Sequence, residues 1–530
     1  MKSIQFIVWS AKQTAPIPFE KDPHMKLSFM RNNNTDTPSP EVIKTDRASD
    51  ITAYILVIIC GAIFISLTFN NNIWLDEAFT ASLVNTDMAG VIKRSMADTL
   101  PPLYNILLKL STDIFGYRIP VMKITSAVPM ILTMLLGATV VRRRFGYLTS
   151  YIFIIAITFM PNMFFYGVEI RMYSLGFMFA TASGICAYEV VCSPSRKNWC
   201  IFTAVSVLAG YSHHFAFVTV GFVYLYLLLY CFFNRMVRSF IKCLAATFIL
   251  YFPCMLVTLK QLKSVSGYFS MPEVTSSVFI KYCRYPFTVG FTPLSILLLT
   301  VTFFLFLRRL FRSPKNTEDM FSLYCFLIYY GVLLFGTIIS RIMTANIFVD
   351  RYLFFALGLI WLFFAIETGK LTEASKEAEA GGRFNGVLTF LIILLELSVG
   401  VVTYTNALKS EYAPGADEVI AFLGENVSNG DSLYTLEEYE ELAYCLTFYD
   451  DRLTNYESLE NAIHAAGSGT VWVAVMHGYE TADKNRLPDG NEGYEAYIDE
   501  IENKGYSLES MGQFSFDRYM FRLYRLTGSK

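Results

Sequence analysis

The sequence predicts an α-helical polytopic membrane protein with about 11 transmembrane helices, additional interfacial helices and a C-terminal soluble α/β domain. Of the 530 residues, 54% are hydrophobic and only 17% are charged, against about a quarter charged in an average soluble protein. Mean hydropathy is +0.41, and long apolar runs recur between residues 51 and 404. Residues 405–530, in contrast, carry 23 acidic and 9 basic residues. Such an excess of charge is typical of a solvated domain.

The first 50 residues are predicted to form a flexible cytoplasmic tail. They are mostly polar, contain five prolines, and lack the apolar core and cleavage site of a signal peptide. The ten cysteines of the chain include no CxxC pair, which argues against cysteine-based zinc and redox sites. The basic residues form short clusters and no continuous stripe, which argues against a nucleic-acid partner.

Residues 51–404 are predicted to form the transmembrane domain. A helix needs about 20 apolar residues to cross a bilayer core about 30 Å thick. Lys and Arg gather in alternate loops, at residues 142–144, 196–197, 235–242, 308–315 and 370–383. Because basic loops stay in the cytoplasm, the N-terminus is expected inside and the C-terminal domain outside. The predicted crossings lie near residues 51–69, 121–141, 147–166, 172–192, 199–213, 215–233, 239–258, 291–309, 321–340, 352–367 and 385–404.

Two further segments complete the predicted architecture. The apolar run 102–115 is too short for a crossing, so we expect a helix in the outer membrane interface; a tilted true crossing is the alternative. Residues 405–530 are expected to form the extracytoplasmic α/β domain. They contain turn pairs at 429–430 and 489–490, a β-rich run at 470–476 and helical stretches near 417–426 and 494–503.

Ionisable residues beside the hydrocarbon core are the functional candidates, because charge is costly there. Each also has a structural reading: an acidic helix start, a snorkelling arginine or an interfacial histidine. Their convergence from separate loops on one face favours an active site. On the predicted topology this outer face holds Asp76, Glu77, Asp98, Glu169, Arg171, His213, His214, Arg341, Asp350 and Arg351.

Five motifs occur in a characteristic order: WLDEAFT at 74–80, DTLPPLYNILLKL at 98–110, EIRMYSL at 169–175, YSHHFA at 211–216 and DRYL at 350–353. In this order the chain resembles the polytopic glycosyltransferases of the C superfamily, in the branch related to protein O-mannosyltransferases and the lipid A aminoarabinose transferase. The resemblance spans roughly residues 70–370. It implies a polyprenyl-phosphate sugar as donor and an acidic catalytic residue in the first outer loop.

The resemblance also implies roles for individual residues. Asp76 takes the catalytic position, Glu77 the adjacent acidic position, and Glu169 with Arg171 the second charged cluster. The family often has His or Lys before the double proline, where this chain has Leu100. Arginine or histidine from elsewhere must then hold the phosphate. The candidate catalytic residues are therefore Asp76, Glu77 and Glu169, and the candidate donor-phosphate ligands are Arg171, Arg351, Tyr173, His213 and His214.

The sequence thus predicts a membrane glycosyltransferase that moves a sugar to an acceptor hydroxyl on the extracytoplasmic face, with inversion and with Asp76 as general base. The acceptor is a lipid, polymer or protein, and the expected location is a bacterial plasma membrane. No cofactor is certain; a divalent metal ion is compatible with the acidic and histidine residues, but no ligand spacing compels it. The alternatives are a transporter or flippase of lipid-linked sugars and a non-catalytic scaffold.

Overall fold

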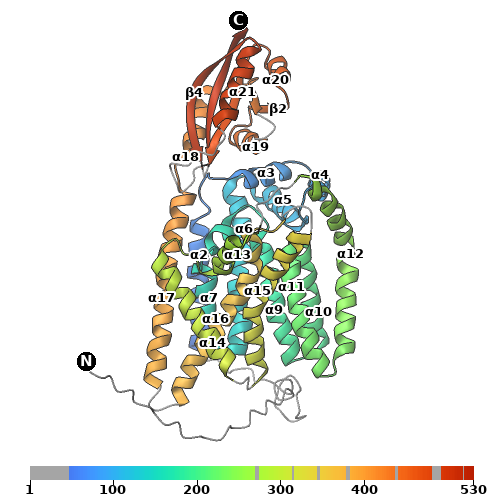
Figure 1. Ribbon diagram of the computed structural model, residues 1–530, viewed down its shortest axis with the longest axis vertical. Coiled ribbons are helices and arrows are strands. Elements are labelled where there is room, and N and C mark those ends of the chain that lie inside the picture. Colours follow the sequence, from blue (N-terminus) through green and yellow to red (C-terminus); the bar gives the residue numbers. More distant parts are fainter. Residues whose placement is uncertain are drawn as a thin grey trace, which may run out of the picture.

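The structure is a computed structural model in which a bundle of long helices carries a small sheet domain at one end (Figure 1). It describes residues 47–268, 274–312, 316–342, 347–377, 382–435, 440–479, 491–516 and 519–529. The sheet domain is built from the C-terminal residues. We call the end of the bundle beneath it the sheet-domain end.

Helices occupy all eleven predicted crossings in the described chain. Among the described residues, nine ranges are long and apolar enough to span a membrane, and α10 (Arg196–Ser212), with 17 residues, is not one of them. One of them, Ile119–Phe159, breaks at Gly146, whose φ of 84° suits glycine, and the chain then folds back so that Ser150 Oγ donates to the Gly137 carbonyl. The helices are α2 (Arg47–Ser66), α6 (Ile119–Leu136) with the π-helical turn η1 (Gly137–Val141), α7 (Arg142–Phe159), α9 (Tyr173–Cys192), α10 (Arg196–Ser212), α11 (His214–Phe233), α12 (Val237–Tyr268), α14 (Thr292–Phe311), α15 (Thr317–Ile342), α16 (Phe354–Glu377) and α17 (Gly382–Glu411).

The predicted tail, residues 1–50, lies almost wholly outside the described residues. Residues 47–50 are described, and they belong to the first turn of α2. The helix therefore begins earlier than the predicted crossing at residue 51. Asp50 in this turn forms an ion pair with Arg142, the first residue of α7, and an acidic side chain there also complements the helix dipole.

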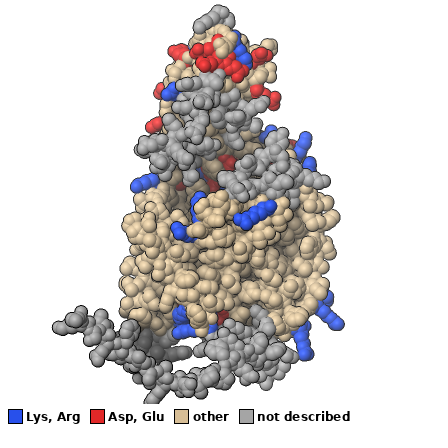
Figure 2. Space-filling model, in the orientation of Figure 1, with Lys and Arg blue, Asp and Glu red and all other residues tan. Residues whose placement is uncertain are grey.

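The basic clusters lie at the end of the bundle away from the sheet domain. Besides the Asp50–Arg142 pair, Arg144 Nε lies 2.6 Å from Glu189 Oε1 near the C-terminus of α9. Figure 2 shows Lys and Arg side chains along the lower end and also on the upper part of the bundle, whereas the visible acidic side chains gather mainly on the sheet domain. The positive-inside rule concerns the clusters of Lys and Arg in the loops, which it expects on one side of a membrane.

Helix α16 forms the centre of the bundle. In its most apolar stretch 94% of the residues are buried inside the protein, and it packs against α7, α9, α15 and α17. Close packing against α9 depends on Gly358, where an added Cβ would lie 1.9 Å from Thr181 Oγ1. A helix that is apolar all round and buried in this way anchors the helices that surround it.

Short helices connect the bundle helices at the sheet-domain end (Figure 1). Helix α5 has 13 residues, fewer than a crossing needs. It buries Tyr104 and Leu108 and exposes Leu110 and Ile114, as an amphipathic helix does. These connecting elements are α3 (Leu75–Val84), α4 (Met88–Ala97), α5 (Leu103–Phe115), α8 (Met163–Val168), α13 (Ser276–Arg284) and the 3₁₀ turns η2 (Tyr285–Phe287) and η3 (Asp350–Leu353).

The sheet domain contains a five-stranded sheet in the order β2-β1-β3-β5-β4. β1 pairs in parallel with β2 and β3, whereas β5 is antiparallel to β3 and β4. Helix α17 continues past the predicted boundary at residue 404 and ends at Glu411. The elements are α18 (Gly415–Asn426), β1 (Ser432–Thr435), α19 (Glu440–Tyr449), β2 (Thr454–Tyr456), α20 (Leu459–Ala466), β3 (Val471–Tyr479), α21 (Asn491–Asn503), β4 (Tyr506–Phe516) and β5 (Tyr519–Ser529).

Two fully buried glutamates in the bundle differ in their partners. Glu367 Oε1 on α16 accepts a hydrogen bond from Ser322 Oγ at 2.8 Å, and its Oε2 lies 3.3 Å from Arg308 Nη1. Glu396 on α17 has no hydrogen-bond partner for either carboxylate oxygen within the described part of the chain. A buried polar group without a partner costs folding free energy, so Glu396 weakens the bundle while Glu367 holds three helices together.

Substitution of the two glutamates is therefore expected to shift stability in opposite directions. Glu396→Leu removes an unsatisfied group and should stabilise the bundle by about 1–3 kcal/mol. Glu367→Gln leaves Arg308 without its ionic partner and should destabilise it by about 3 kcal/mol. Thermal unfolding of both variants in detergent measures the shifts. A lower unfolding midpoint for Glu396→Leu would show that this carboxyl has a stabilising role.

Candidate active site

The N-terminus of α3 carries the two adjacent acidic residues, which lie in different surroundings. Glu77 is buried, and both of its carboxylate oxygens accept backbone hydrogen bonds: Oε2 from Trp74 N at 3.0 Å and Oε1 from Ile170 N at 2.7 Å. The first bond caps α3, and the second joins it to the loop before α9. Asp76 keeps 31% of its side chain exposed. Glu77 thus holds two loops together, and Asp76 can meet a ligand.

The loop between α8 and α9 brings Glu169 and Arg171 to the same place. Arg171 Nη1 donates to Thr80 Oγ1 at 2.8 Å and to the Asp76 carbonyl at 3.3 Å, so it braces the first turns of α3. Glu169 Oε1 accepts a hydrogen bond from Trp74 Nε1 at 3.0 Å. Glu169 Oε2 and Arg171 Nε are buried and have no partner among the described residues. Both atoms are available to a ligand.

Arg351 in η3 completes the charged centre, although it lies 275 positions from Asp76 in the sequence. Its Nη1 lies 3.1 Å from Asp76 Oδ2. Its guanidinium carbon lies 6.0 Å from the centroid of the Trp74 ring and 5.9 Å from that of Tyr352, within the range of cation–π contacts. Arg351 Nε also has no partner in the described chain. The partly exposed Asp76 carboxylate therefore pairs with Arg351, while Arg171 is bonded to the backbone carbonyl of the same residue.

His213 and Tyr173 border this centre, whereas His214 faces another way. His213 is buried, its Nδ1 accepts a hydrogen bond from Phe215 N, and its ring centroid lies 5.0 Å from that of Tyr352 and 6.2 Å from that of Tyr173. Its Nε2 has no partner among the described residues. His214 Nε2 lies 3.2 Å from the carbonyl oxygen of Thr99. His214 thus supports the segment before the double proline.

Burial governs the charge state of the inner residues. It raises the pKa of Glu77 to about 7, although Lys123 acts in the opposite direction. It also raises the pKa of Glu169, and the neighbouring carboxylates of Glu77 and Asp76 add to this effect. Burial lowers the pKa of His213, helped by the positive charges near it. At neutral pH the imidazole is therefore uncharged, and Glu169 is biased toward its protonated form.

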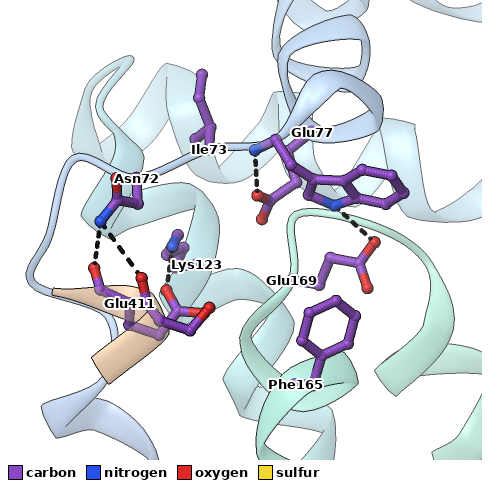
Figure 3. A pocket seen from close by; sticks show the side chains of 9 residues that line it. Asn72, Ile73, Glu77, Lys123, Phe165, Glu169 and Glu411 are labelled. Carbon is purple, nitrogen blue, oxygen red and sulfur yellow. Dashed lines mark hydrogen bonds and ion pairs between the residues drawn. The ribbon is translucent and has the colours of Figure 1, made fainter. Parts of the chain in front are cut away.

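A pocket opens beside Glu77 and Glu169, between the loop before α3 and the end of α17 (Figure 3). Lys123 Nζ donates to Asn70 Oδ1 at 2.9 Å and pairs with Glu411. The pocket lining consists of Asn72, Ile73, Trp74, Glu77, Lys123, Phe165, Glu169, Ser410 and Glu411. In the described residues no group of three or more His, Cys, Asp or Glu is arranged to hold a metal ion.

The structure adds residues that sequence reasoning did not assign to the site. Trp74 bonds Glu169, and Lys123 occupies the predicted crossing 121–141. A lysine within an apolar run was the available signal for Lys123. Burial raises the pKa of Asp98, and the nearby Arg171 guanidinium opposes this rise only in part. The arrangement can bind an anion through its guanidinium groups and accept a proton at a carboxylate.

One known protein family matches part of the chain. Residues 99–257 match the family described as dolichyl-phosphate-mannose-protein mannosyltransferase. The matched range contains Glu169, Arg171 and both histidines, and it begins after Asp76 and Glu77. No curated protein sequence matches the chain.

Solved structures share the fold at low sequence identity. ArnT from Cupriavidus metallidurans, both apo and bound to undecaprenyl phosphate, is 11% identical with a TM-score of 0.57; the match covers 90% of this chain and 98% of ArnT. AglB, an archaeal oligosaccharyltransferase from Archaeoglobus fulgidus in complex with an inhibitory peptide and a dolichol-phosphate, is 11% identical with a TM-score of 0.47 over 88% of this chain and 70% of AglB. The family match and the ArnT fold together confirm the resemblance to the polytopic glycosyltransferases of the C superfamily.

Proposed function

We propose that the protein transfers a sugar from a polyprenyl-phosphate donor to an acceptor hydroxyl, at the sheet-domain end of the bundle and on the extracytoplasmic face of a bacterial plasma membrane. The donor has a long apolar tail and a charged head, so its catalyst needs polar residues at the outer ends of apolar helices. The polar residues of the candidate active site lie at the ends of apolar helices, which supports the proposal. The acceptor is a lipid, polymer or protein with a free hydroxyl group.

The observation that carries the proposal is the Asp76–Arg351 pair beside Arg171. A guanidinium group binds carboxylate and phosphate with the same bidentate geometry, so a phosphate oxygen competes with the Asp76 carboxylate for Arg351. Donor binding at Arg351 would therefore release Asp76 from its ionic partner. The unpartnered Nε atoms of Arg351 and Arg171 and Nε2 of His213 supply further hydrogen-bonding capacity toward the phosphate, with Tyr173 beside them.

The proposed reaction is a single displacement with inversion. The acceptor oxygen forms a bond to the anomeric carbon, and the bond from that carbon to the phosphate oxygen breaks with its electron pair kept by the phosphate. Asp76 takes the hydroxyl proton, which typically contributes about 100- to 10,000-fold in rate. The guanidinium groups stabilise the negative charge on the departing polyprenyl phosphate. Glu77 and Glu169 position the loops and the Trp74 ring around this centre.

A transporter or flippase is the less favoured function, because it requires ionisable residues along a path through the membrane. The charged residues of the candidate site gather at one end of the bundle. Glu396 is buried within the 385–404 crossing. It has no hydrogen-bond or ion-pair partner among the described residues. A single carboxyl does not define a path.

Asp76→Asn should lower sugar transfer at least about 100-fold, because the amide keeps the shape of the side chain but cannot accept the proton. Glu77→Gln should retain measurable turnover, because its role is to hold the two loops. The assay measures release of polyprenyl phosphate from a panel of polyprenyl-phosphate hexoses and pentoses labelled in the sugar. Normal turnover by Asp76→Asn in the purified protein would refute the assignment of Asp76 as the base.

Arg351→Ala should weaken binding of undecaprenyl phosphate at least about tenfold, since a hydrogen bond to a charged group contributes about 1.5–3 kcal/mol. Lys281→Ala is the matched control: Lys281 pairs with the neighbouring Asp350 but is 72% exposed. It should bind the lipid normally. Equilibrium binding to both detergent-solubilised variants tests this, and equal affinity of Arg351→Ala and the wild type would leave Arg351 as an interfacial anchor.

The proposed orientation predicts which residues an impermeant reagent reaches in intact cells. Cysteine at position 428 in the sheet domain should react from outside, and cysteine at position 197 in the first turn of α10 should not. Ser428→Cys and Lys197→Cys are both on exposed sites, in a background with the ten native cysteines replaced. Labelling with a membrane-impermeant maleimide measures the result. Reaction at 197 with protection at 428 would invert the topology.

A further inference from the structure

Helix α19 of the sheet domain lies directly over α3, the helix that carries Asp76 (Figure 1). One side of α19 packs against β1, β2 and β3 and the other against α3. A single apolar cluster runs through both parts, with Leu75, Ala78 and Ala81 from α3 and Leu442 and Leu446 from α19. The hydrophobic core of the sheet domain is therefore continuous with the apolar side of α3, the helix that carries Asp76.

Three aromatic side chains of α19 contact three points around α3. The Tyr444 ring lies edge-on to Phe79 of α3 at a centroid distance of 5.8 Å. The Phe448 ring lies 5.4 Å from Tyr117, whose hydroxyl donates to the Ala81 carbonyl in the last turns of α3 at 2.8 Å. Tyr449 Oη donates to the carbonyl of Asn71 in the loop that leads into α3 at 3.2 Å. Together these contacts reach α3 and the segment before it.

Polar contacts tie the loop before α3 to the start of the sheet domain as well. Asn71 Nδ2 donates to Asp417 Oδ1 of α18 at 2.8 Å. Asn72 Nδ2 donates to the carbonyl oxygens of Glu411 and Ala413, each at 2.8 Å, and Figure 3 shows the side chain of Asn72 turned toward Glu411. The sheet domain thus holds this loop at the junction with α17 and the helix itself through α19.

We propose that the sheet domain is a positioning part of the active site, in which Tyr444 on α19 fixes the orientation of α3 and thereby the distance from the Asp76 carboxylate to the acceptor. This inference rests on the proposed function. Helix α3 has only 10 residues, and a helix this short is marginal by itself. Its N-terminus is fixed by Glu77 and Arg171, while Tyr444 and Tyr117 fix its further turns. Without them the further turns of α3 lose their packing, and only Glu77 and Arg171 hold the turn that carries Asp76.

A less rigidly held α3 would let the Asp76 carboxylate shift from its reacting position without removing any phosphate ligand. A displacement of about 1 Å at a reacting group can cost about 100-fold in rate. Arg351 and His213 come from other elements, so the donor should still bind. Loss of the Tyr444 contact is therefore expected to lower kcat and to leave donor affinity unchanged, whereas loss of a phosphate ligand changes donor affinity.

The test uses the full-length protein with Tyr444→Ala, Tyr444→Phe and Tyr497→Ala. Tyr444→Ala should lower kcat for the donor that the wild type turns over by about 10- to 100-fold, with undecaprenyl phosphate affinity within about twofold of wild type. Tyr444→Phe keeps the ring and should restore kcat. Tyr497 is equally aromatic and is buried in a separate cluster with Val473 and Tyr524, so Tyr497→Ala should lower the stability of the domain without lowering kcat.

A double-mutant cycle with Phe79→Ala guards against misfolding of one variant. Phe79→Ala and Tyr444→Ala remove the same contact, so their effects on kcat should be far from multiplicative when combined. Wild-type kcat in Tyr444→Ala, multiplicative effects in the cycle, or an equal loss of kcat in Tyr497→Ala would each overturn the inference. These outcomes leave the Asp76→Asn result untouched, and an active Asp76→Asn variant refutes the proposed function separately.

Discussion

Hydrocarbon cannot solvate charge, and this constraint determines where ionised groups of the chain can lie. Lys and Arg clusters take one end of the helix bundle, where they pair with Asp50 and Glu189. The carboxylates and guanidinium groups of the candidate site take the other end. Between the ends, the described helices present almost continuous apolar surface. The charged groups of the candidate site are thereby confined to one end of the bundle, where the head group of the proposed lipid-borne donor would lie.

Within the candidate site, buried side chains hold the structure together, and partly exposed side chains can react. Glu77 is buried and accepts hydrogen bonds from the backbone of Trp74 and Ile170. Arg171 is also buried, and it donates to Thr80. The Asp76 carboxylate pairs with Arg351, and both side chains remain partly exposed. Adjacent carboxylates can therefore serve opposite purposes, because successive helix residues point in directions about 100° apart. The helix start turns one acid toward the interior and the other toward the ligand.

Sequence reasoning identified the helices because 20 apolar residues are a long and unambiguous signal. It also predicted that the charged candidate residues lie on one face. Basic loops mark one end of each helix, so the loops at the other ends must lie together on the opposite side. It could not find the partners of Glu77, because a bond to the backbone of Ile170 carries no side-chain signature. It placed the end of the last crossing at residue 404, and so separated Glu411 from the helix that presents it to Lys123. Periodicity predicts helices and strands from neighbouring residues. The Glu77–Ile170 and Lys123–Glu411 contacts join residues 93 and 288 positions apart, and they form only in the assembled fold.

Helix α17 passes without interruption from the far end of the bundle to the base of the sheet domain. Its last residue, Glu411, is held by Lys123 of α6 and Asn70, and the next elements are held by the loop before α3. A domain attached by one flexible strand of chain can swing, but this one is attached covalently at one point and by side chains at others. These contacts hold the base of the sheet domain against the end of the bundle, so the acceptor of the proposed reaction would have to reach Asp76 from beside the domain.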